Sequence, residues 1–438
     1  MITAVVGRTF LKAYNQKYGK ALTPKEFFDQ EYFEIFFNHP KYMQWVTNSP
    51  FVQMKKGQKP HLLSTAERQE KLENLSIKIN QEEADASFAI GFPASEAKSF
   101  ASTSGLVSDL DIPSNEDEIY LSWIGSGLGL GVAGGYSILF DDPEITLQTF
   151  EGWKHYRKYL NEPALAKLRG NQVNSWNGQW VAYSLSADYR DDFTFGELTE
   201  EEIFKNDEKG AEVNTVAWSQ LYFSLGNLNS EKPLTAYIYG HGQTNKTIGF
   251  IPFRLISGKK IREVYQKLFG EDYEIDRKDF ESLFGIHIKR ACELGSIGLS
   301  ALRPSTLAKY MKNDKTLSFK KSQDTVTYKA YKTWLVAMLS KNKEEIIDYT
   351  QEVAKVILDY RRSGSGTGRK NHVEKELFGA FTKKKFIEAL IVMIPDLEDK
   401  ALATIKNLRD EVHLMTNEEF GYFATLLKFD YTFFEKQQ

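Results

Sequence analysis

The sequence predicts an α+β protein: a helical N-terminal region, a mixed α/β middle with antiparallel strands, and a C-terminal bundle of four or five helices. Two capping boxes, Thr23–Glu26 and Ser64–Glu67, mark helix starts near the N-terminus. Alternating apolar residues in the middle indicate strands, whereas the apolar stripe from Ile346 to Tyr360 has helical spacing. On these grounds we divide the chain into three regions: 1–115, 116–326 and 327–438.

The composition is that of a globular protein with several domains. Its 438 residues are 42% hydrophobic and 26% charged, which provides enough apolar mass for a sizeable core. The single cysteine, Cys292, excludes an internal disulfide and a zinc site built from cysteines. The sequence lacks a signal-peptide pattern and an apolar stretch of about 18 residues, so we expect a cytoplasmic protein without membrane contact.

The first region is expected to be mostly helical and to end in a polar loop. An aromatic-rich helix follows Thr23, a charged helix runs from Ser64 to about Ile79, and a basic loop at 54–60 lies between them. Residues 81–115 are rich in Ser, Ala and Gly, so we expect a variable loop there with one short strand at 87–92.

The glycine run at 125–135 lies between two segments that are predicted as strands, 118–124 and 136–140. The run contains a formal G-x-G-x-x-G, but a dinucleotide-binding turn must open a helix, and here a strand-like segment follows. We therefore favour a strand-to-strand connection or a close approach of backbones over a nucleotide site. Two further strands, 216–225 and 234–239, predict a hairpin that continues at 247–253.

The segment Asn-Gln-Val-Asn-Ser-Trp-Asn-Gly-Gln-Trp, residues 171–180, has the most unusual composition in the chain. Asn and Gln side chains match the donors and acceptors of base edges, and Trp can stack on bases. The candidates for reading a DNA motif here are Asn171, Gln172, Asn174 and Asn177. The candidates for phosphate contact just upstream are Lys167 and Arg169. The alternative is an Asx-rich turn that leads into a strand with two buried tryptophans.

A second polar loop, residues 240–246, joins two predicted strands and is long for a hairpin. Such a loop can enter a DNA groove, so we add three candidates for motif reading at its tip: Gln243, Asn245 and Lys246. Residues 241–320 carry 15 Lys or Arg against 9 Asp or Glu, although the whole chain has a net charge of −3. The phosphate candidates in this basic stretch are Lys259, Lys260 and Arg262. The alternative is an exposed loop followed by solvated lysines.

A Gly/Ser loop at 363–368 interrupts the C-terminal helices, which are expected near 373–394, 397–413 and 417–427. Cations flank the loop, and Arg369 and Lys370 are candidates for clamping a phosphate. The alternative is a solvated linker between two helices.

The sequence contains none of the common catalytic motifs for zinc proteases, serine hydrolases or P-loop NTPases. The acidic pairs Asp109/Asp111 and Asp191/Asp192 are the only arrangement that suggests Mg²⁺ chemistry, and both lie in turn-like stretches where such pairs are common. We therefore expect no catalytic residues, no metal and no cofactor.

Three parts of the chain together resemble the large subunit of a type I CRISPR Cascade surveillance complex, in the type I-A/I-B branch. They are the segment Gly7–Leu11 in a helical, aromatic N-terminal region, the segment Gly131–Phe140 with its following helix and Asn174–Asn177, and an all-helical C-terminal domain of the size of a Cascade small subunit. Some members of that branch carry a cysteine zinc knuckle, which the single cysteine excludes here.

The resemblance implies a role without chemistry. The protein would contact the CRISPR RNA and target double-stranded DNA, bind other Cascade subunits, read the protospacer-adjacent motif, support strand opening and recruit the helicase–nuclease. It also implies that the C-terminal bundle can be made separately, and Met338 is a candidate internal start. The alternatives are a metal-dependent nuclease that uses the acidic pairs, and an assembly protein without nucleic-acid contact.

Overall fold

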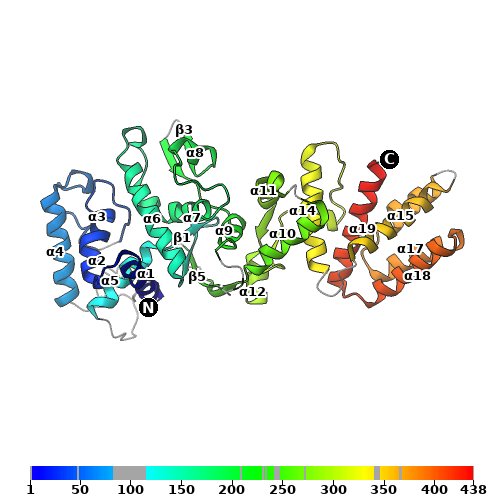
Figure 1. Ribbon diagram of the computed structural model, residues 1–438, viewed down its shortest axis with the longest axis horizontal. Coiled ribbons are helices and arrows are strands. Elements are labelled where there is room, and N and C mark those ends of the chain that lie inside the picture. Colours follow the sequence, from blue (N-terminus) through cyan, green and yellow to red (C-terminus); the bar gives the residue numbers. More distant parts are fainter. Residues whose placement is uncertain are drawn as a thin grey trace. The chain divides into compact units, whose positions relative to one another are not determined.

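The computed structural model has helical N-terminal and C-terminal regions and small antiparallel sheets between them, so the predicted α+β class with a C-terminal helical bundle is confirmed (Figure 1). The structure describes these residues: 2–46, 49–81, 115–207, 210–228, 231, 234–240, 247–270, 273–339, 346–364 and 367–437. The chain forms two compact units, Met1–Leu255 (unit 1) and Ile256–Gln438 (unit 2). This division differs from the predicted boundaries after residues 115 and 326.

Unit 1 begins with helices that enclose an aromatic core. Thr23 and Glu26 form the predicted capping box, and Ser64 and Glu67 form the second one. The rings of Phe10 and Phe27 lie 5.2 Å apart in this core. The elements are α1 (Ile2–Tyr18), α2 (Pro24–Phe27), a π-helical turn (Phe28–Tyr32), α3 (Phe33–Phe36), a 3₁₀ turn (Pro60–Leu62) and α4 (Thr65–Gln81).

The segment predicted as a strand at 118–124 is instead part of helix α5 (Glu116–Gly127), so that prediction was wrong. Asn115 caps the helix by accepting a hydrogen bond from the backbone of Glu118, and three acidic residues occupy the first turn. Helix α5 is buried on every side from Ile119 onward, so its sequence shows no single apolar stripe. It packs against α1 (Figure 1).

The helices α1 and α5 cross at two glycines with their backbones in close contact. A Cβ atom at Gly125 would lie 1.8 Å from the carbonyl oxygen of Thr3, and one at Gly7 would lie 2.1 Å from that of Leu121. The hydroxyl groups of Thr3 and Ser122 share a 2.8 Å hydrogen bond at the same crossing. Only residues without a side chain permit this approach.

A four-stranded antiparallel sheet, in the order β1-β2-β5-β6, forms the centre of unit 1. The predicted strands at 136–140, 234–239 and 247–253 are present, but the segment 216–225 forms helix α9 instead. The turn between β1 and β2 uses Gly134 and Gly135, both with positive φ. The elements are β1 (Leu130–Val132), β2 (Tyr136–Phe140), β5 (Leu234–Gly240), β6 (Gly249–Phe253) and α9 (Trp218–Leu225).

The remaining elements of unit 1 surround this sheet. Helix α6 (Pro143–Leu160) follows β2, and Asp142 is its cap. The Asn/Trp segment, for which the alternative interpretation was a turn and a strand, forms helix α7 (Val173–Ser184). The other elements are 3₁₀ turns at Pro163–Leu165 and Gly170–Gln172, α8 (Phe195–Glu200), β3 (Phe204–Asp207) and β4 (Gly210–Val213).

Unit 2 is mostly helical and contains a small two-stranded antiparallel sheet of β7 with β8. The elements before the bundle are α10 (Ile256–Phe269), α11 (Tyr273–Ser282), β7 (Phe284–Ile286), α12 (Ile288–Leu294), β8 (Leu302–Pro304) and α13 (Leu307–Met311). The bundle comprises α14 (Ser322–Leu339), α15 (Ile346–Arg362), α16 (Gly368–Asn371), a π-helical turn (His372–Leu377), α17 (Lys383–Met393), a 3₁₀ turn (Ile394–Asp396), α18 (Asp399–Leu414) and α19 (Asn417–Gln437).

A buried ion pair joins three helices of the bundle. The amine of Lys332 on α14 lies 2.5 Å from a carboxylate oxygen of Asp430 on α19, and both side chains are almost fully buried. The hydroxyl groups of Tyr328 and Thr350 donate to the same carboxylate, at 3.2 Å and 3.0 Å. Helix α15 supplies Thr350, so α14, α15 and α19 meet at this buried cluster.

The ion pair bears on the predicted internal start at Met338. This residue lies in the last turn of α14 rather than ahead of a new helix, and a product of residues 338–438 would lack Lys332. Asp430 would then keep no cationic partner from α14. We expect a fragment of residues 338–438 to unfold at lower urea concentration than a fragment of residues 322–438, as measured by circular dichroism. Equal midpoints would contradict a stabilising role for α14.

Among the described residues, no helix combines the length and the apolar character that crossing a bilayer requires.

Candidate nucleic-acid interface

The outer face of strands β5 and β6 carries exposed aromatic side chains. Along these strands, every second residue is buried: Ala236, Ile238, Ile251 and Phe253. The residues between them point to the other face. There Tyr237 pairs with Phe250 across the strands, and their ring centroids lie 5.2 Å apart. Phe250 is 64% exposed, which is unusual for so large an apolar ring.

Tyr239 continues this row, and its side chain contacts strand β2. Its ring lies 6.0 Å from that of Tyr237, at an interplanar angle of 29°. The Tyr239 hydroxyl forms a hydrogen bond with the side chain of Ser137, and burial raises the pKa of this tyrosine. Phe250 is the exposed ring of the row and its cross-strand partner Tyr237 is half-buried; we call these two residues the aromatic strand face.

The loop between β5 and β6 contains three predicted motif-reading residues. Gln243, Asn245 and Lys246 lie outside the described residues. The two strands that the loop connects are paired from Leu234–Phe253 to Ile238–Gly249. In the sequence, the loop therefore connects the two strands that carry the aromatic row. The predicted role of its tip residues stays a prediction.

The Asn/Trp segment has a structural role, and it forms helix α7 where the alternative interpretation expected a turn and a strand with two buried tryptophans. Asn177 is completely buried, and its amide donates to the carbonyl oxygens of Gly127 at 2.8 Å and Gly129 at 3.0 Å. Asn174 donates to Gly129 and to the hydroxyl of Ser137, both at 3.3 Å. In this conformation Asn177 has no access to a base, because its side chain is buried and its amide is used inside the protein.

The tryptophans of this segment are buried and bonded to α6. The indole nitrogen of Trp176 donates to Gly152 at 2.7 Å, and that of Trp180 donates to Gln148 at 2.9 Å. The side-chain oxygen of Gln172 accepts a 3.3 Å hydrogen bond from the backbone of Val213. Of the four motif-reading candidates in this segment, Asn171 is the exposed one.

The predicted close approach of backbones at the glycine run is confirmed at Gly131. A Cβ atom at Gly178 on α7 would lie 2.2 Å from the carbonyl oxygen of Gly131 on β1. A Cβ atom at Gly131 would lie 2.8–2.9 Å from the backbone of Asn174. Helix α7 therefore rests directly on the sheet, which explains why the Asn/Trp segment is turned inward.

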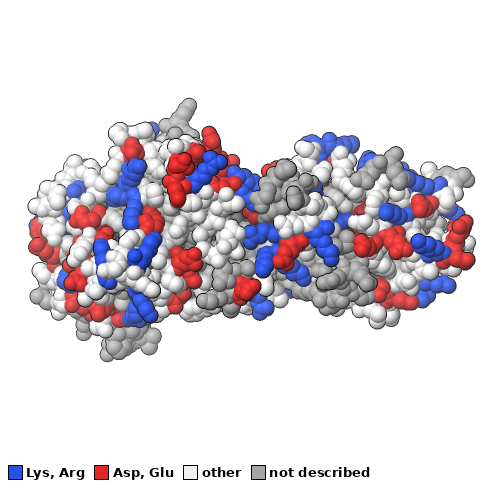
Figure 2. Space-filling view, viewed as in Figure 1, with Lys and Arg blue, Asp and Glu red and all other residues white. Residues whose placement is uncertain are grey.

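The predicted phosphate contacts are distributed over several elements. In unit 1, Arg169 is 62% exposed and forms an ion pair with Glu212, and Lys167 is exposed nearby in the chain. In unit 2, Lys259 is exposed on α10, and Lys260 and Arg262 are half-buried. Figure 2 shows Lys and Arg mixed with Asp and Glu over α10 and α12, so the local basic excess forms no uniform patch on this face.

Arg369 has many partners within unit 2, whereas Lys370 remains accessible. The Arg369 guanidinium lies 3.0 Å from Asp396, donates to Ser363 at 2.5 Å and sits 4.8 Å from the ring centre of Tyr360. A phosphate at Arg369 would have to displace Asp396. Lys370 is 52% exposed and lies 4.0 Å from Glu374, which is a weak surface pair.

The acidic pair Asp191/Asp192 lies on an exposed turn after α7, and Asp109/Asp111 lie outside the described residues. Burial and the hydrogen bond to Asp191 raise the pKa of Tyr189 to about 12. Within the described part of the chain, no three His, Cys, Asp or Glu side chains gather in a way that would hold a metal ion.

Comparison with known proteins gives no relative: no family model, no curated protein and no solved structure matches the chain.

Proposed function

We propose that the protein is a non-catalytic subunit of an RNA-guided DNA surveillance complex of the type I CRISPR Cascade kind. In this role it reads the protospacer-adjacent motif, supports strand opening and recruits the helicase–nuclease. The observation that supports nucleic-acid binding is the aromatic strand face, where Tyr237 and the 64% exposed Phe250 project from an antiparallel sheet. Such faces stack unpaired bases in several families of single-strand-binding proteins.

The proposal divides the recognition between two neighbouring parts of one hairpin. Bases of an opened strand would stack on Tyr237 and Phe250. The loop that joins β5 to β6 would carry Gln243, Asn245 and Lys246 to the duplex ahead of the opened strand. In guided recognition, a short motif is read by protein and the remaining sequence by base pairing, which matches this arrangement.

The substitution Phe250→Ala tests the proposed function directly. Because Phe250 is largely exposed, its loss should leave the fold intact, whereas losing one stacked base weakens binding by about 1–3 kcal/mol. We expect fluorescence anisotropy with a labelled single-stranded oligonucleotide at low salt to show about 5- to 150-fold weaker binding. The double substitution with Tyr237→Ala should weaken binding further.

A matched control is available in unit 2. Phe381 is 65% exposed, almost the same as Phe250, but it precedes helix α17 rather than lying on a sheet. The substitution Phe381→Ala should leave the affinity for the oligonucleotide unchanged. Equal losses for both variants, or no measurable binding by the unaltered protein alone and with its genomic neighbours, would refute the proposal.

The assembly-protein alternative is favoured by a second observation. Phe381 and Leu414 are 65% and 80% exposed, and the amine of Lys383 donates to the backbone oxygens of His413 and Met415. The two apolar side chains thus flank one junction between α17 and α18. If this junction binds another subunit, Phe381→Ala should abolish co-purification with that subunit while oligonucleotide binding persists.

A further inference from the structure

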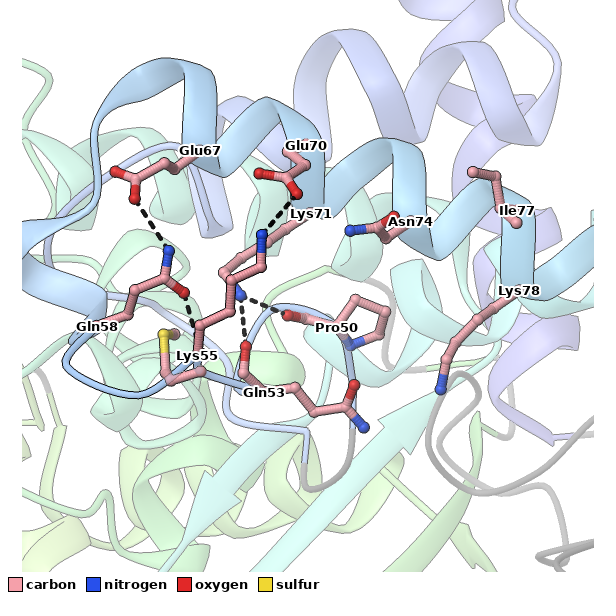
Figure 3. A pocket seen from close by; sticks show the side chains of 11 residues that line it. Pro50, Gln53, Lys55, Gln58, Glu67, Glu70, Lys71, Asn74, Ile77 and Lys78 are labelled. Atoms are coloured by element: carbon pink, nitrogen blue, oxygen red, sulfur yellow. Dashed lines mark hydrogen bonds and ion pairs between the residues drawn. The ribbon is translucent and has the colours of Figure 1, made fainter.

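A polar pocket lies in unit 1, between the loop 50–58 and helix α4 (Figure 3). Its volume is about 370 Å³, which lies in the range of cavities that bind small molecules. Three lysines line it, Lys55, Lys71 and Lys78, together with the carboxamides of Gln53, Gln58 and Asn74 and the carboxylates of Glu67 and Glu70. None of the candidate nucleic-acid residues discussed above contributes to it.

Lys71 is a buried cation without a directly bonded carboxylate. The residue is 8% exposed, and its amine donates to the carbonyl oxygens of Pro50 at 3.0 Å and Gln53 at 2.5 Å. An ammonium group has three donors, so one remains after these two bonds. Burial is the largest influence on this group and lowers the pKa of Lys71, although the neighbouring Glu70 opposes the shift. An anion in the pocket would favour the charged form.

The two carboxylates of the pocket already have partners. Glu67 caps α4 through Ser64, whose backbone donates to it at 2.8 Å, and it also accepts from the Gln58 amide at 2.9 Å. Glu70 lies 3.1 Å from the amine of Lys55. As Figure 3 shows, these contacts lie at one end of the pocket and leave Asn74 and Lys78 at the other.

Asn74 and Lys78 follow Lys71 at helical spacing and share its face of α4. Within the described part of the chain, neither of these two side chains has a hydrogen bond or an ion pair. Figure 3 shows both extending to the same side of the helix as the amine of Lys71. Two amines and one carboxamide therefore line this side of α4, and none of the three forms a direct bond with a carboxylate among the described residues.

We propose that this pocket is a binding site for a phosphate-bearing ligand, held by Lys71, Asn74 and Lys78. A phosphate group has more acceptor oxygens than a carboxylate. It can therefore accept hydrogen bonds from three donors on successive turns of one helix. The cavity is larger than one phosphate, so it has room for part of the attached molecule. The phosphate can belong to a free small molecule or to the end of a nucleic-acid strand.

The substitution Lys78→Gln removes one charge from the pocket without disturbing the bonds that hold the loop. We expect isothermal titration calorimetry of the full chain with inorganic phosphate or adenosine monophosphate to show about ten-fold weaker binding in this variant. Asn74→Ala should weaken binding by a smaller factor. Lys56→Gln is the matched control, because Lys56 is an exposed lysine of the same loop that does not line the pocket.

The source of the phosphate is distinguished by a second pair of titrations, with one oligonucleotide carrying either a 5′-phosphate or a 5′-hydroxyl. A preference for the phosphorylated over the hydroxyl-ended strand would support recognition of a strand end, provided that Lys78→Gln removes this preference and Phe250→Ala keeps it. Binding of adenosine monophosphate without a preference between the strands would support a free small molecule. The proposal would be overturned if Lys78→Gln, like Lys56→Gln, left the affinity unchanged for inorganic phosphate, adenosine monophosphate and both oligonucleotides. This conclusion would hold whatever the outcome for the aromatic strand face.

Discussion

The substitution Lys332→Met is expected to destabilise unit 2 by about 3–5 kcal/mol. It keeps the length and apolar stem of the side chain but removes the amine that lies 2.5 Å from Asp430. The Asp430 carboxylate would remain fully buried, with only the hydroxyl groups of Tyr328 and Thr350 as donors. A buried charge without a partner costs far more than a lost surface pair, because desolvation is no longer offset.

The loss can be measured on unit 2 alone, because Trp334 is its single tryptophan. This residue lies on α14 close to Lys332 along the chain, and its indole donates to Leu302 at 2.6 Å. Protein labelled with 5-fluorotryptophan should give a separate fluorine resonance for Trp334, whose urea midpoint reports the unfolding of unit 2. The double variant Lys332→Met/Asp430→Leu should recover much of the loss. A midpoint unchanged by Lys332→Met would contradict the role assigned to the ion pair.

The substitution Gly125→Ala is expected to cost about 3 kcal/mol or more in unit 1. The new methyl group would lie 1.8 Å from the carbonyl oxygen of Thr3, so α1 and α5 must move apart. The obstacle is backbone rather than a flexible side chain, and the shift would also open the close packing at Gly7. It would also break the hydrogen bond between Thr3 and Ser122.

A matched control for this prediction is Gly196→Ala in helix α8. A Cβ atom there meets only the hydroxyl of Thr194, at an ordinary 3.6 Å. Because alanine favours a helix over glycine, this variant should be neutral or more stable by about 0.5–1 kcal/mol. Thermal unfolding by circular dichroism compares the two variants. Equal effects would show that the glycine in α5 reflects local propensity rather than the close crossing.

The helices that begin at a visible cap could be predicted from the sequence, because a cap is a local interaction. Thr23 and Ser64 each bond to the first turn of a helix as predicted. The two segments wrongly predicted as strands, 118–124 and 216–225, lie largely in helices whose residues are buried nearly all round. A helix without a polar face has no amphipathic period, and its aromatic and β-branched residues favour strands on propensity alone.

The candidate site could be predicted only in part for a related reason. The alternation of residues 234–240 indicated a strand, but which of its two faces is exposed depends on where α7 packs. Because α7 covers the Ser137 side of β1 and β2, the Asn/Trp segment is buried while Tyr237 and Phe250 remain accessible further along the sheet. Polar composition pointed to residues 171–177, whereas exposure, a property of the tertiary structure, points to the hairpin.

The crossing of α1 and α5 also sets an order of events during synthesis. The hydrogen-bonded residues Thr3 and Ser122 are separated by 119 positions, so α1 leaves the ribosome long before its main partner exists. At about 5–20 residues per second, the delay is roughly 5–20 s. Throughout that interval the face of α1 that carries Thr3 and Gly7 has no α5 to pack against. A nascent chain in this state exposes apolar surface that the folded protein buries, which makes it prone to aggregate until Gly127 has emerged.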